Sequence, residues 1–340
     1  MKRIAMLIAF AALLNACGGG SDQAAQPPYA TITYSTTYTA YDADGPGGNN
    51  PRTYNIRITA PDLNGVFPIG VLLSGTSDTD GSLGLSVFAT QLAQRGVIAA
   101  EVGYNNGTSE GCGCDGMGPG GACGNPFIRY YDKAQAIFDN GNADSAIRRL
   151  VTATSTLNAQ ASLAKGVVVI AFSQGTVVGR QADNWLRPYI RGAYFLGSGN
   201  RPRGGPVCGR QDWYCNESTY PGVIPGNIVR FMTGEQDTFF SRPQNDAARC
   251  DMLSAEDTRT QNEKISGCTS PTDTCELIGG GGWRVIRNSL VEDGIADHAY
   301  FNGDSKWRDG RSDLTMGWTL ADNLDWLISK LGAPGPGAAR

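Results

Sequence analysis

Histidine is the scarcest chemically active residue in this sequence, which has a single imidazole, His298, in 340 residues. Protein zinc sites are built mainly from histidine and cysteine, so the cysteines would have to supply most of the ligands of any such site. The cysteines between residues 112 and 123 follow Cys-Gly-Cys and Cys-x8-Cys spacings, which match no common zinc pattern. The sequence therefore predicts no metal site and implies no cofactor.

Positive charge is also sparse, and it is not concentrated anywhere along the chain. The net charge is −4, and no run of lysine or arginine forms a stripe that could neutralise a phosphate backbone. Nucleic acid is therefore not an expected partner.

The N-terminus has an apolar run, residues 4–12, that is too short to span a bilayer as a mature helix. Two positive residues stand before this run, within residues 1–3, and small residues follow it up to Cys17. This arrangement is typical of a bacterial export signal. We expect residues 1–16 to be a signal peptide and the mature protein to be exported.

The motif Leu14-Asn15-Ala16-Cys17 resembles the lipobox of bacterial lipoproteins, after which the chain is cleaved and the new N-terminal cysteine is acylated. The resemblance implies an acyl anchor on Cys17 that attaches the protein to a membrane. Residues 17–29 would then be a flexible lipidated tether, and the protein would lie in the outer envelope, in the periplasm or at the cell surface. A secreted protein with an ordinary signal peptide is the alternative, because small residues also favour ordinary cleavage.

Cysteine is frequent in the rest of the chain. Of nine cysteines, eight are left when Cys17 is set aside, and an even number in an exported chain indicates disulfides that link loop insertions. Spacing does not decide the pairing, although Cys208 with Cys215 is the most local choice. The eight are Cys112, Cys114, Cys123, Cys208, Cys215, Cys250, Cys268 and Cys275.

Strand and helix patterns alternate along the chain. The expected strands cover residues 31–39, 53–60, 69–75, 97–104, 166–172, 192–198, 227–234 and 283–291, and the expected helices cover 82–95, 127–139, 143–159, 174–186 and 317–331. The first two strands are expected to form an antiparallel pair at a sheet edge. Asn142 is expected to cap the start of the helix at 143–159, and Gly332 to end the helix at 317–331. The alternation predicts one α/β domain over residues 30–332, with a mostly parallel sheet of about eight strands covered by helices on both faces. Residues 333–340 are expected to be a loose tail.

The segment Ala171-Phe172-Ser173-Gln174-Gly175 stands directly between a predicted strand and a predicted helix. It resembles the nucleophile elbow of α/β-hydrolases, G-x-S-x-G, with Ala171 in place of the first glycine. Small residues are needed two positions before and after the serine, because the turn is strained and its neighbours are close. The resemblance implies the α/β-hydrolase fold with Ser173 as nucleophile.

The remaining members of a catalytic triad follow in the order that this family uses. Asp237 comes just after the predicted strand at 227–234, and His298 lies between the last predicted strand and the final helix. The resemblance implies that His298 is the general base and that Asp237 orients it. Glu235 and Asp251 are the alternatives for the acid.

An oxyanion hole needs backbone donors at two places, one after the nucleophile and one in the loop after the third strand. Gln174 occupies the first position, and Thr76 is the expected donor in the second, with Gly75 and Ser77 as alternatives. The Ser-Gln pair and the hydroxyl-rich loop resemble cutinases. The insertion at residues 241–282 is not cutinase-like. It is either a lid or substrate-binding wall held by disulfides, or a surface excursion.

Taken together, these resemblances imply a serine esterase that forms an acyl-enzyme on Ser173. A peptidase or an acyltransferase would use the same triad. A different class of protein, a surface lipoprotein that only binds a ligand on a hydrolase core, is also compatible with the sequence.

Overall fold

The computed structural model describes residues 28–42, 50–75, 85–104, 126–197, 224–237, 262–263, 266–291, 293–298, 300–303 and 318–332. The segment Tyr29–Ala333 forms one compact unit. The signal peptide, Cys17, nearly all of the tether and the C-terminal tail lie outside the described residues, so their roles stay predictions.

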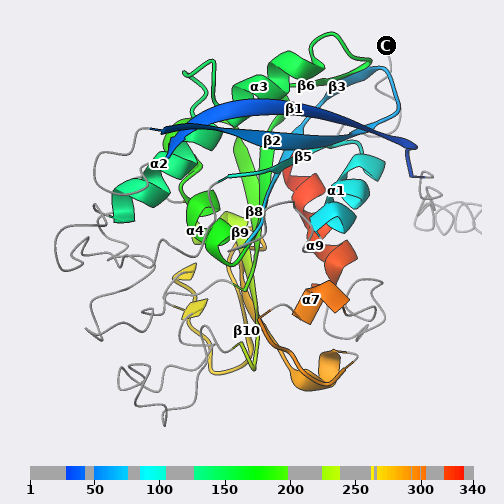
Figure 1. The fold of residues 1–340 in the computed structure, drawn as a ribbon. Helices are drawn as coiled ribbons and strands as arrows, with labels where there is room; N and C mark the ends of the chain where they lie inside the picture. Colours follow the sequence, from blue (N-terminus) through cyan, green and yellow to red (C-terminus); the bar gives the residue numbers. More distant parts are fainter. Residues whose placement is uncertain are drawn as a thin grey trace, which may run out of the picture. The chain divides into compact units, whose positions relative to one another are not determined.

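A nine-stranded mixed sheet runs through this unit, in the order β1-β2-β5-β4-β7-β8-β9-β11-β10 (Figure 1). The six neighbouring strands from β5 to β11 are mutually parallel, whereas β1–β2, β2–β5 and β11–β10 pair antiparallel. The strands are β1 Thr31–Asp42, β2 Asn50–Pro61, β4 Ile69–Leu73, β5 Ile98–Val102, β7 Val167–Phe172, β8 Ile190–Leu196, β9 Val229–Gly234, β10 Thr274–Glu276 and β11 Gly282–Ile286. The predicted α/β sheet and its antiparallel edge pair are confirmed, with one strand more than expected.

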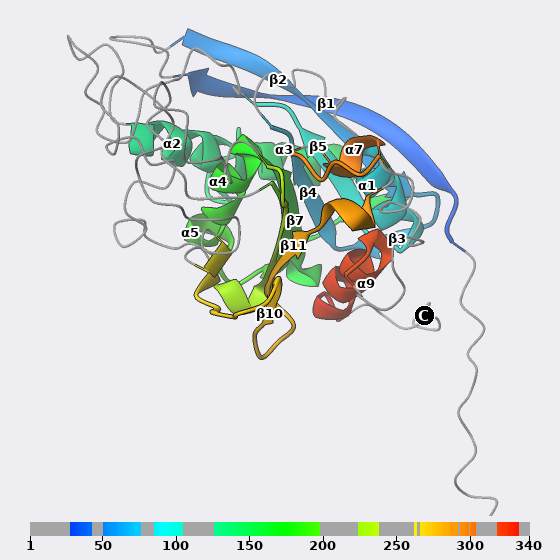
Figure 2. The same cartoon turned by 90° about the horizontal axis from the view of Figure 1, so that it is seen from below.

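Helices cover both faces of the sheet, and Figures 1 and 2 show α2 and α4 on one side of it and α1 and α9 on the other. One face packs against α2 Pro126–Phe138, α3 Ala146–Thr154, α4 Gln174–Arg180 and α5 Asp183–Leu186. The other packs against α1 Leu85–Gln94, α7 Tyr300–Gly303 and α9 Leu320–Lys330. A separate two-stranded sheet pairs β3 Gly65–Phe67 with β6 Ala159–Ala161.

The central strands are buried on both faces, which explains the mainly apolar runs in their sequences, although β5 contains Glu101 and β9 contains Arg230. Every residue of β4, β5, β7 and β9 is buried. Parallel strands covered by helices on both sides require such runs, because neither face meets water. The site described below lies at the carboxyl ends of β7 and β9.

Two helix predictions are corrected by the structure. The predicted helix at 174–186 is interrupted, because α4 ends at Arg180 and α5 begins at Asp183. Ser145, not Asn142, caps α3 by accepting a hydrogen bond from the Arg148 N–H. The Asn142 side chain instead accepts from the Asp144 N–H and forms a turn before the cap.

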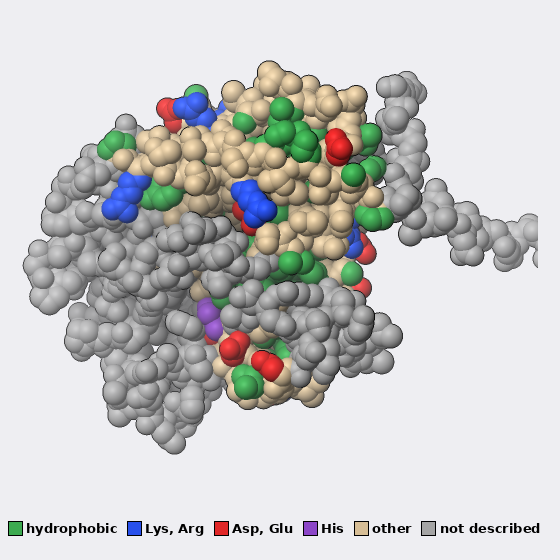
Figure 3. Space-filling model, turned by 45° about the vertical axis from the view of Figure 1, so that its right-hand side comes forward, with side chains coloured by type: hydrophobic (Ala, Val, Ile, Leu, Met, Phe, Trp, Pro, Cys, Tyr) green, Lys and Arg blue, Asp and Glu red, His purple; other side chains and the backbone are tan. Residues whose placement is uncertain are grey.

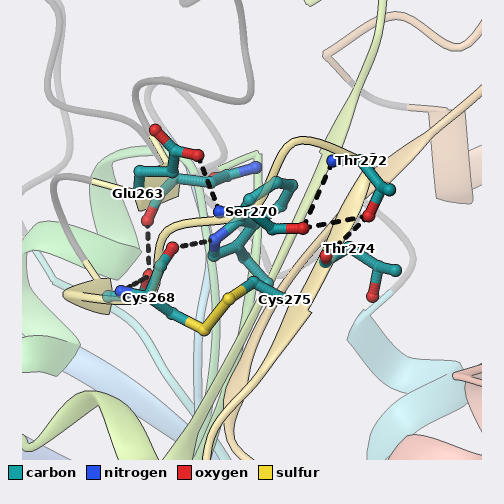
Figure 4. The surroundings of a disulfide bond; sticks show 9 residues. Glu263, Cys268, Ser270, Thr272, Thr274 and Cys275 are labelled. Carbon is teal, nitrogen blue, oxygen red and sulfur yellow. Dashed lines mark hydrogen bonds between the residues drawn. A yellow bond between two sulfur atoms is a disulfide. The ribbon is translucent and has the colours of Figure 1, made fainter.

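The predicted insertion at 241–282 is described only at its end, where it belongs to the sheet. There, β10 extends the sheet at its edge, next to β11. A disulfide joins Cys268 to Cys275 (Figure 4), and Cys268 O accepts a hydrogen bond of 2.6 Å from the Trp283 indole. The described end of the insertion is therefore an edge of the sheet stapled by a disulfide. Residues 241–261 and the other six candidate disulfide cysteines fall outside the described ranges, so the lid stays a prediction.

The described helices are all too short or too polar to cross a bilayer.

Candidate active site

Ser173 lies on a sharp turn between β7 and α4. Its backbone has φ of 50° and ψ of −120°, and residues other than glycine rarely adopt such a positive φ. The turn is held on both sides, because Ser173 N–H donates to Leu196 O and Thr176 donates to Ser173 O through both its N–H and its hydroxyl. The serine side chain is thereby presented at the end of β7, and Ser173 is 8% exposed.

The small residues around Ser173 have a clear steric reason. A Cβ on Gly175 would lie 2.5 Å from Leu73 O and 2.6 Å from Ser74 O, so α4 starts in direct contact with the end of β4. On the other side, Ala171 is fully buried and faces Gly179 of the helix, whose added Cβ would lie 3.4 Å from that of Ala171. The tight strand-to-helix crossing therefore tolerates alanine at position 171 and requires glycine at 175.

The imidazole of His298 joins two side chains from distant parts of the sequence. Its Nε2 lies 2.8 Å from Ser173 Oγ, and its Nδ1 lies 2.8 Å from Asp237 Oδ2. The Asp237 side chain is fully buried, whereas the histidine side chain is 13% exposed, and the chain's one histidine is visible at the surface in Figure 3. The structure thus brings together the three residues that the sequence singled out.

The loops that carry Asp237 and His298 are packed directly against each other. A Cβ on Gly234 would lie 2.2 Å from Ala296 O, so glycine is the residue that allows this contact. Gln236 N–H donates to Ala296 O at 2.9 Å, and Glu235 N–H donates to Ile286 O at 2.9 Å. The distance between acid and base is therefore set by backbone contacts as well as by their own hydrogen bond.

The alternatives for the acid are differently placed. Glu235 forms an ion pair of 3.1 Å with Arg287, which also forms a two-bond pair with Asp273 at 2.6 Å per bond. These hydrogen bonds, that of Asp273 first, raise the pKa of Arg287. Asp251 falls outside the described residues, and among those described Asp237 is the carboxylate hydrogen-bonded to the imidazole.

The expected oxyanion donors are described in part. Gln174 is the first residue of α4, a position whose backbone N–H has no partner within the helix. Gly75 ends the described part of the loop after β4, and its added Cβ would lie 3.0 Å from Ser173 Cβ. Thr76 and Ser77 lie beyond this point and are not described. The loop is anchored by Tyr104, whose hydroxyl donates to Ser74 O at 2.6 Å.

An aromatic cluster that sequence reasoning did not single out lies on one side of the imidazole. Phe172 stacks on His298 with ring centroids 4.8 Å apart, and Phe301 packs edge-on against Phe172 at 4.8 Å. Tyr300 is buried beside them, and burial, with smaller effects of Tyr194 and Asp237, raises the pKa of its phenol. The position of Phe172 inside the elbow motif is the one signal that could have identified it.

No protein-family model and no curated protein matches the sequence. Among solved structures, a bacterial heroin esterase is 12% identical over 88% of this chain and 83% of its own, with a TM-score of 0.44. A putative dienelactone hydrolase from Klebsiella pneumoniae is 10% identical over 89% of this chain and 100% of its own, with a TM-score of 0.38. Brefeldin A esterase, a bacterial homologue of human hormone-sensitive lipase, is 19% identical over 48% of this chain, which spans only 39% of that esterase, with a TM-score of 0.29. At these identities and TM-scores, the matches assign no activity and no substrate to this chain.

Proposed function

We propose that the protein is a serine hydrolase of the α/β-hydrolase fold that cleaves carboxylic esters through an acyl-enzyme on Ser173. One observation carries this proposal. A single imidazole is hydrogen-bonded on one side to a serine hydroxyl on a strained strand-to-helix turn, and on the other side to a fully buried carboxylate, each at 2.8 Å. A serine hydroxyl needs an adjacent base to act as a nucleophile at neutral pH, and a third group that orients the base completes the arrangement.

The hydrogen-bond partners determine the tautomer of the imidazole. A carboxylate only accepts hydrogen bonds, so Nδ1 must carry the proton that is donated to Asp237 Oδ2. In the neutral ring, Nε2 is then free to accept the proton of the Ser173 hydroxyl, 2.8 Å away. His298 is thus ready to act as general base without any rearrangement of the site.

In the proposed reaction, Ser173 Oγ attacks the ester carbonyl carbon while His298 Nε2 takes the hydroxyl proton. Asp237 stabilises the imidazolium that forms, and it stays ionised throughout. The tetrahedral oxyanion is stabilised by the backbone N–H of Gln174 and by a donor of the loop at Thr76. His298 then returns its proton to the leaving alcohol, and water, deprotonated by the same nitrogen, releases the acid and restores the serine.

The decisive experiment is hydrolysis of a short p-nitrophenyl ester by the mature protein and by its Ser173→Ala and His298→Ala variants. We expect turnover by the wild-type protein and a loss of several orders of magnitude in kcat/KM in both variants, each assayed at a temperature where circular dichroism shows that it is folded. Labelling of the wild-type protein by a fluorophosphonate, with none in Ser173→Ala, would identify the nucleophile directly. A folded wild-type protein that neither turns over esters nor is labelled would overturn the proposal and leave the ligand-binding lipoprotein.

We also propose that the hydrolase is exported and anchored through acylated Cys17. The support for this is the sequence of residues 1–17, and the test is mass spectrometry of the protein from bacterial membranes. An N-terminal diacylglyceryl cysteine at position 17 is expected. A soluble product that starts at another residue would instead indicate secretion.

A further inference from the structure

The imidazole of His298 contacts two further groups, a ring and a backbone, in addition to its two hydrogen-bond partners. The ring of Phe172 lies against it at 4.8 Å between centroids, with an angle of 39° between the planes. Gly197, the residue directly after β8, lies so close that a Cβ at this position would be 2.9 Å from His298 Cε1 and 3.0 Å from Nδ1. The same Cβ would also be 3.0 Å from Cε2 of Phe172.

Neither of these two groups can easily move away. Phe172 is 4% exposed and is packed against Phe301, and an added Cβ on Gly75 would lie 2.9 Å from its ring. Gly197 is tied to the neighbouring strand, because its N–H donates to Met232 O at 2.8 Å. Both groups are buried at the carboxyl ends of neighbouring strands, β7 and β8, and such a close-packed interior resists displacement.

Gly197 also has a backbone conformation that only glycine adopts easily, with φ of +55°. This conformation directs the chain past the imidazole with a hydrogen atom where any other residue would have a side chain. A side chain here would therefore press on Nδ1, which is the atom bonded to Asp237 Oδ2.

We propose that Phe172 and Gly197 form a slot that holds the His298 ring in the orientation that reaches both Ser173 and Asp237, which makes Gly197 a positioning residue of acyl transfer. This inference rests on the proposed function for its catalytic consequence only. The slot itself is a statement about the position of a ring, and it can be tested without turnover.

The first test compares Gly197→Ala with Gly332→Ala. Gly332 has nearly the same backbone conformation, with φ of +58°, but its added Cβ would meet nothing within 4 Å. The control therefore introduces the same backbone strain without the clash. Because a displacement of about 1 Å can cost on the order of 100-fold, we expect Gly197→Ala to lose about that factor in fluorophosphonate labelling rate, and Gly332→Ala to keep the wild-type rate.

The second test uses the fact that the chain has one histidine. In untagged protein with ¹⁵N- and ¹³C-labelled histidine, every imidazole signal comes from His298. We expect one sharp set of ring signals in the wild-type protein and in Gly332→Ala, and shifted or multiple signals in Gly197→Ala. Phe172→Leu should move the ring-proton signals, because it removes an aromatic ring stacked at 4.8 Å.

The double variant Phe172→Leu/Gly197→Ala distinguishes a shared slot from two separate effects. If both residues hold the same ring, the combined loss in labelling rate is smaller than the product of the two single losses. Unchanged histidine signals and a wild-type labelling rate in Gly197→Ala would overturn the slot while leaving the proposed function intact. A wild-type protein that is not labelled, but whose histidine signals respond as expected, would leave the slot standing and overturn the proposed function.

Discussion

Two residues other than glycine have a positive φ in the described part of the chain, Ser173 at 50° and Trp318 at 60°. Such a conformation costs about 1–2 kcal/mol for an L-residue, so each must be held by its surroundings. Ser173 has a small side chain that is hydrogen-bonded to the imidazole of His298, whereas Trp318 has the largest side chain of any residue and is 5% exposed.

The turn at Trp318 is held by the tryptophan itself. Its ring stacks on Arg230, whose guanidinium carbon lies 4.3 Å from the ring centre. The same carbon lies 4.5 Å from the ring centre of Trp326. Arg230 also donates to Asn323 Oδ1 at 2.9 Å, and Asn323 donates to Trp318 O at 2.7 Å. Burial lowers the pKa of Arg230 to about 10, which still leaves it charged at neutral pH.

The comparison separates two uses of backbone strain. At Trp318, stacking and hydrogen bonds of the strained residue offset the cost, so the strain is a by-product of packing. At Ser173, the backbone is held by Leu196 and Thr176, and the side chain instead points to the imidazole of His298. Strain that the residue's own side chain does not offset is typical of functional sites.

The largest effect is expected at Ser173, with Ser173→Gly and Ser173→Ala as a matched pair. Both variants should lose ester hydrolysis by several orders of magnitude, because neither has a nucleophile. Ser173→Gly should be about 1 kcal/mol more stable than Ser173→Ala in urea unfolding, because glycine adopts a positive φ without strain. Equal stabilities would mean that this turn is not strained.

For Trp318→Gly, we expect a loss of stability without a loss of ester hydrolysis. Loss of a buried tryptophan should lower the free energy of unfolding by roughly 3 kcal/mol, less a contribution of about 1 kcal/mol from the relieved backbone. Ester hydrolysis by the folded variant should persist, and Trp318→Phe, which keeps an aromatic ring over Arg230, should lose less stability. If Trp318→Gly abolished hydrolysis at a temperature where the protein is folded, the two strained turns would not be separable.

The Cys268–Cys275 disulfide allows a smaller test of the separation between residues that stabilise the fold and residues that support catalysis. The turn between β10 and β11, next to the Cys268–Cys275 disulfide, provides carbonyl groups to the residues that pack on Trp318. Arg230 donates to Gly280 O at 2.9 Å, and Trp326 donates to Gly279 O at 3.3 Å. Replacing Cys268 and Cys275 by serine should lower the free energy of unfolding by about 2 kcal/mol, as expected for a short closed loop. Hydrolysis should stay at the wild-type level, and a large fall in kcat would show that the hairpin supports the triad.

The smallest effect is expected for Tyr300→Phe at alkaline pH. The folded pKa of Tyr300 is raised above the ordinary value of 10.0, so the folded state keeps a proton that the unfolded state loses. This contribution to stability is fully present below pH 10 and is lost as the pH rises through the folded pKa. Melting temperatures from pH 8 to pH 11 should therefore fall less steeply in Tyr300→Phe than in the wild-type protein, and parallel curves would contradict this assignment.

The sequence predicted those parts of the molecule whose pattern is local. Apolar runs such as β4 and β7 were recognised because full burial favours them, whereas β3, β6 and β10 have three residues each and depend on their neighbours for pairing. The strand-to-helix context of Ser173 and the single histidine indicated two site residues in advance. Gly197 and the stacking of Phe172 could not be predicted, because they depend on which backbone passes the imidazole in the folded chain.

The two edges of the sheet differ in a way that matters for handling the protein. At one end, β10 has three residues, while at the other β1 has 12 residues and pairs with β2 along its whole length. An edge strand directs half of its main-chain groups outward, so β1 offers a long template on which another extended chain could align. Its exposed alternate residues, from Thr31 to Thr39, are all threonine or serine, which favours hydration over association. Apolar substitutions on this strand would therefore be the changes that most directly reduce solubility, even though the strand lies away from the triad.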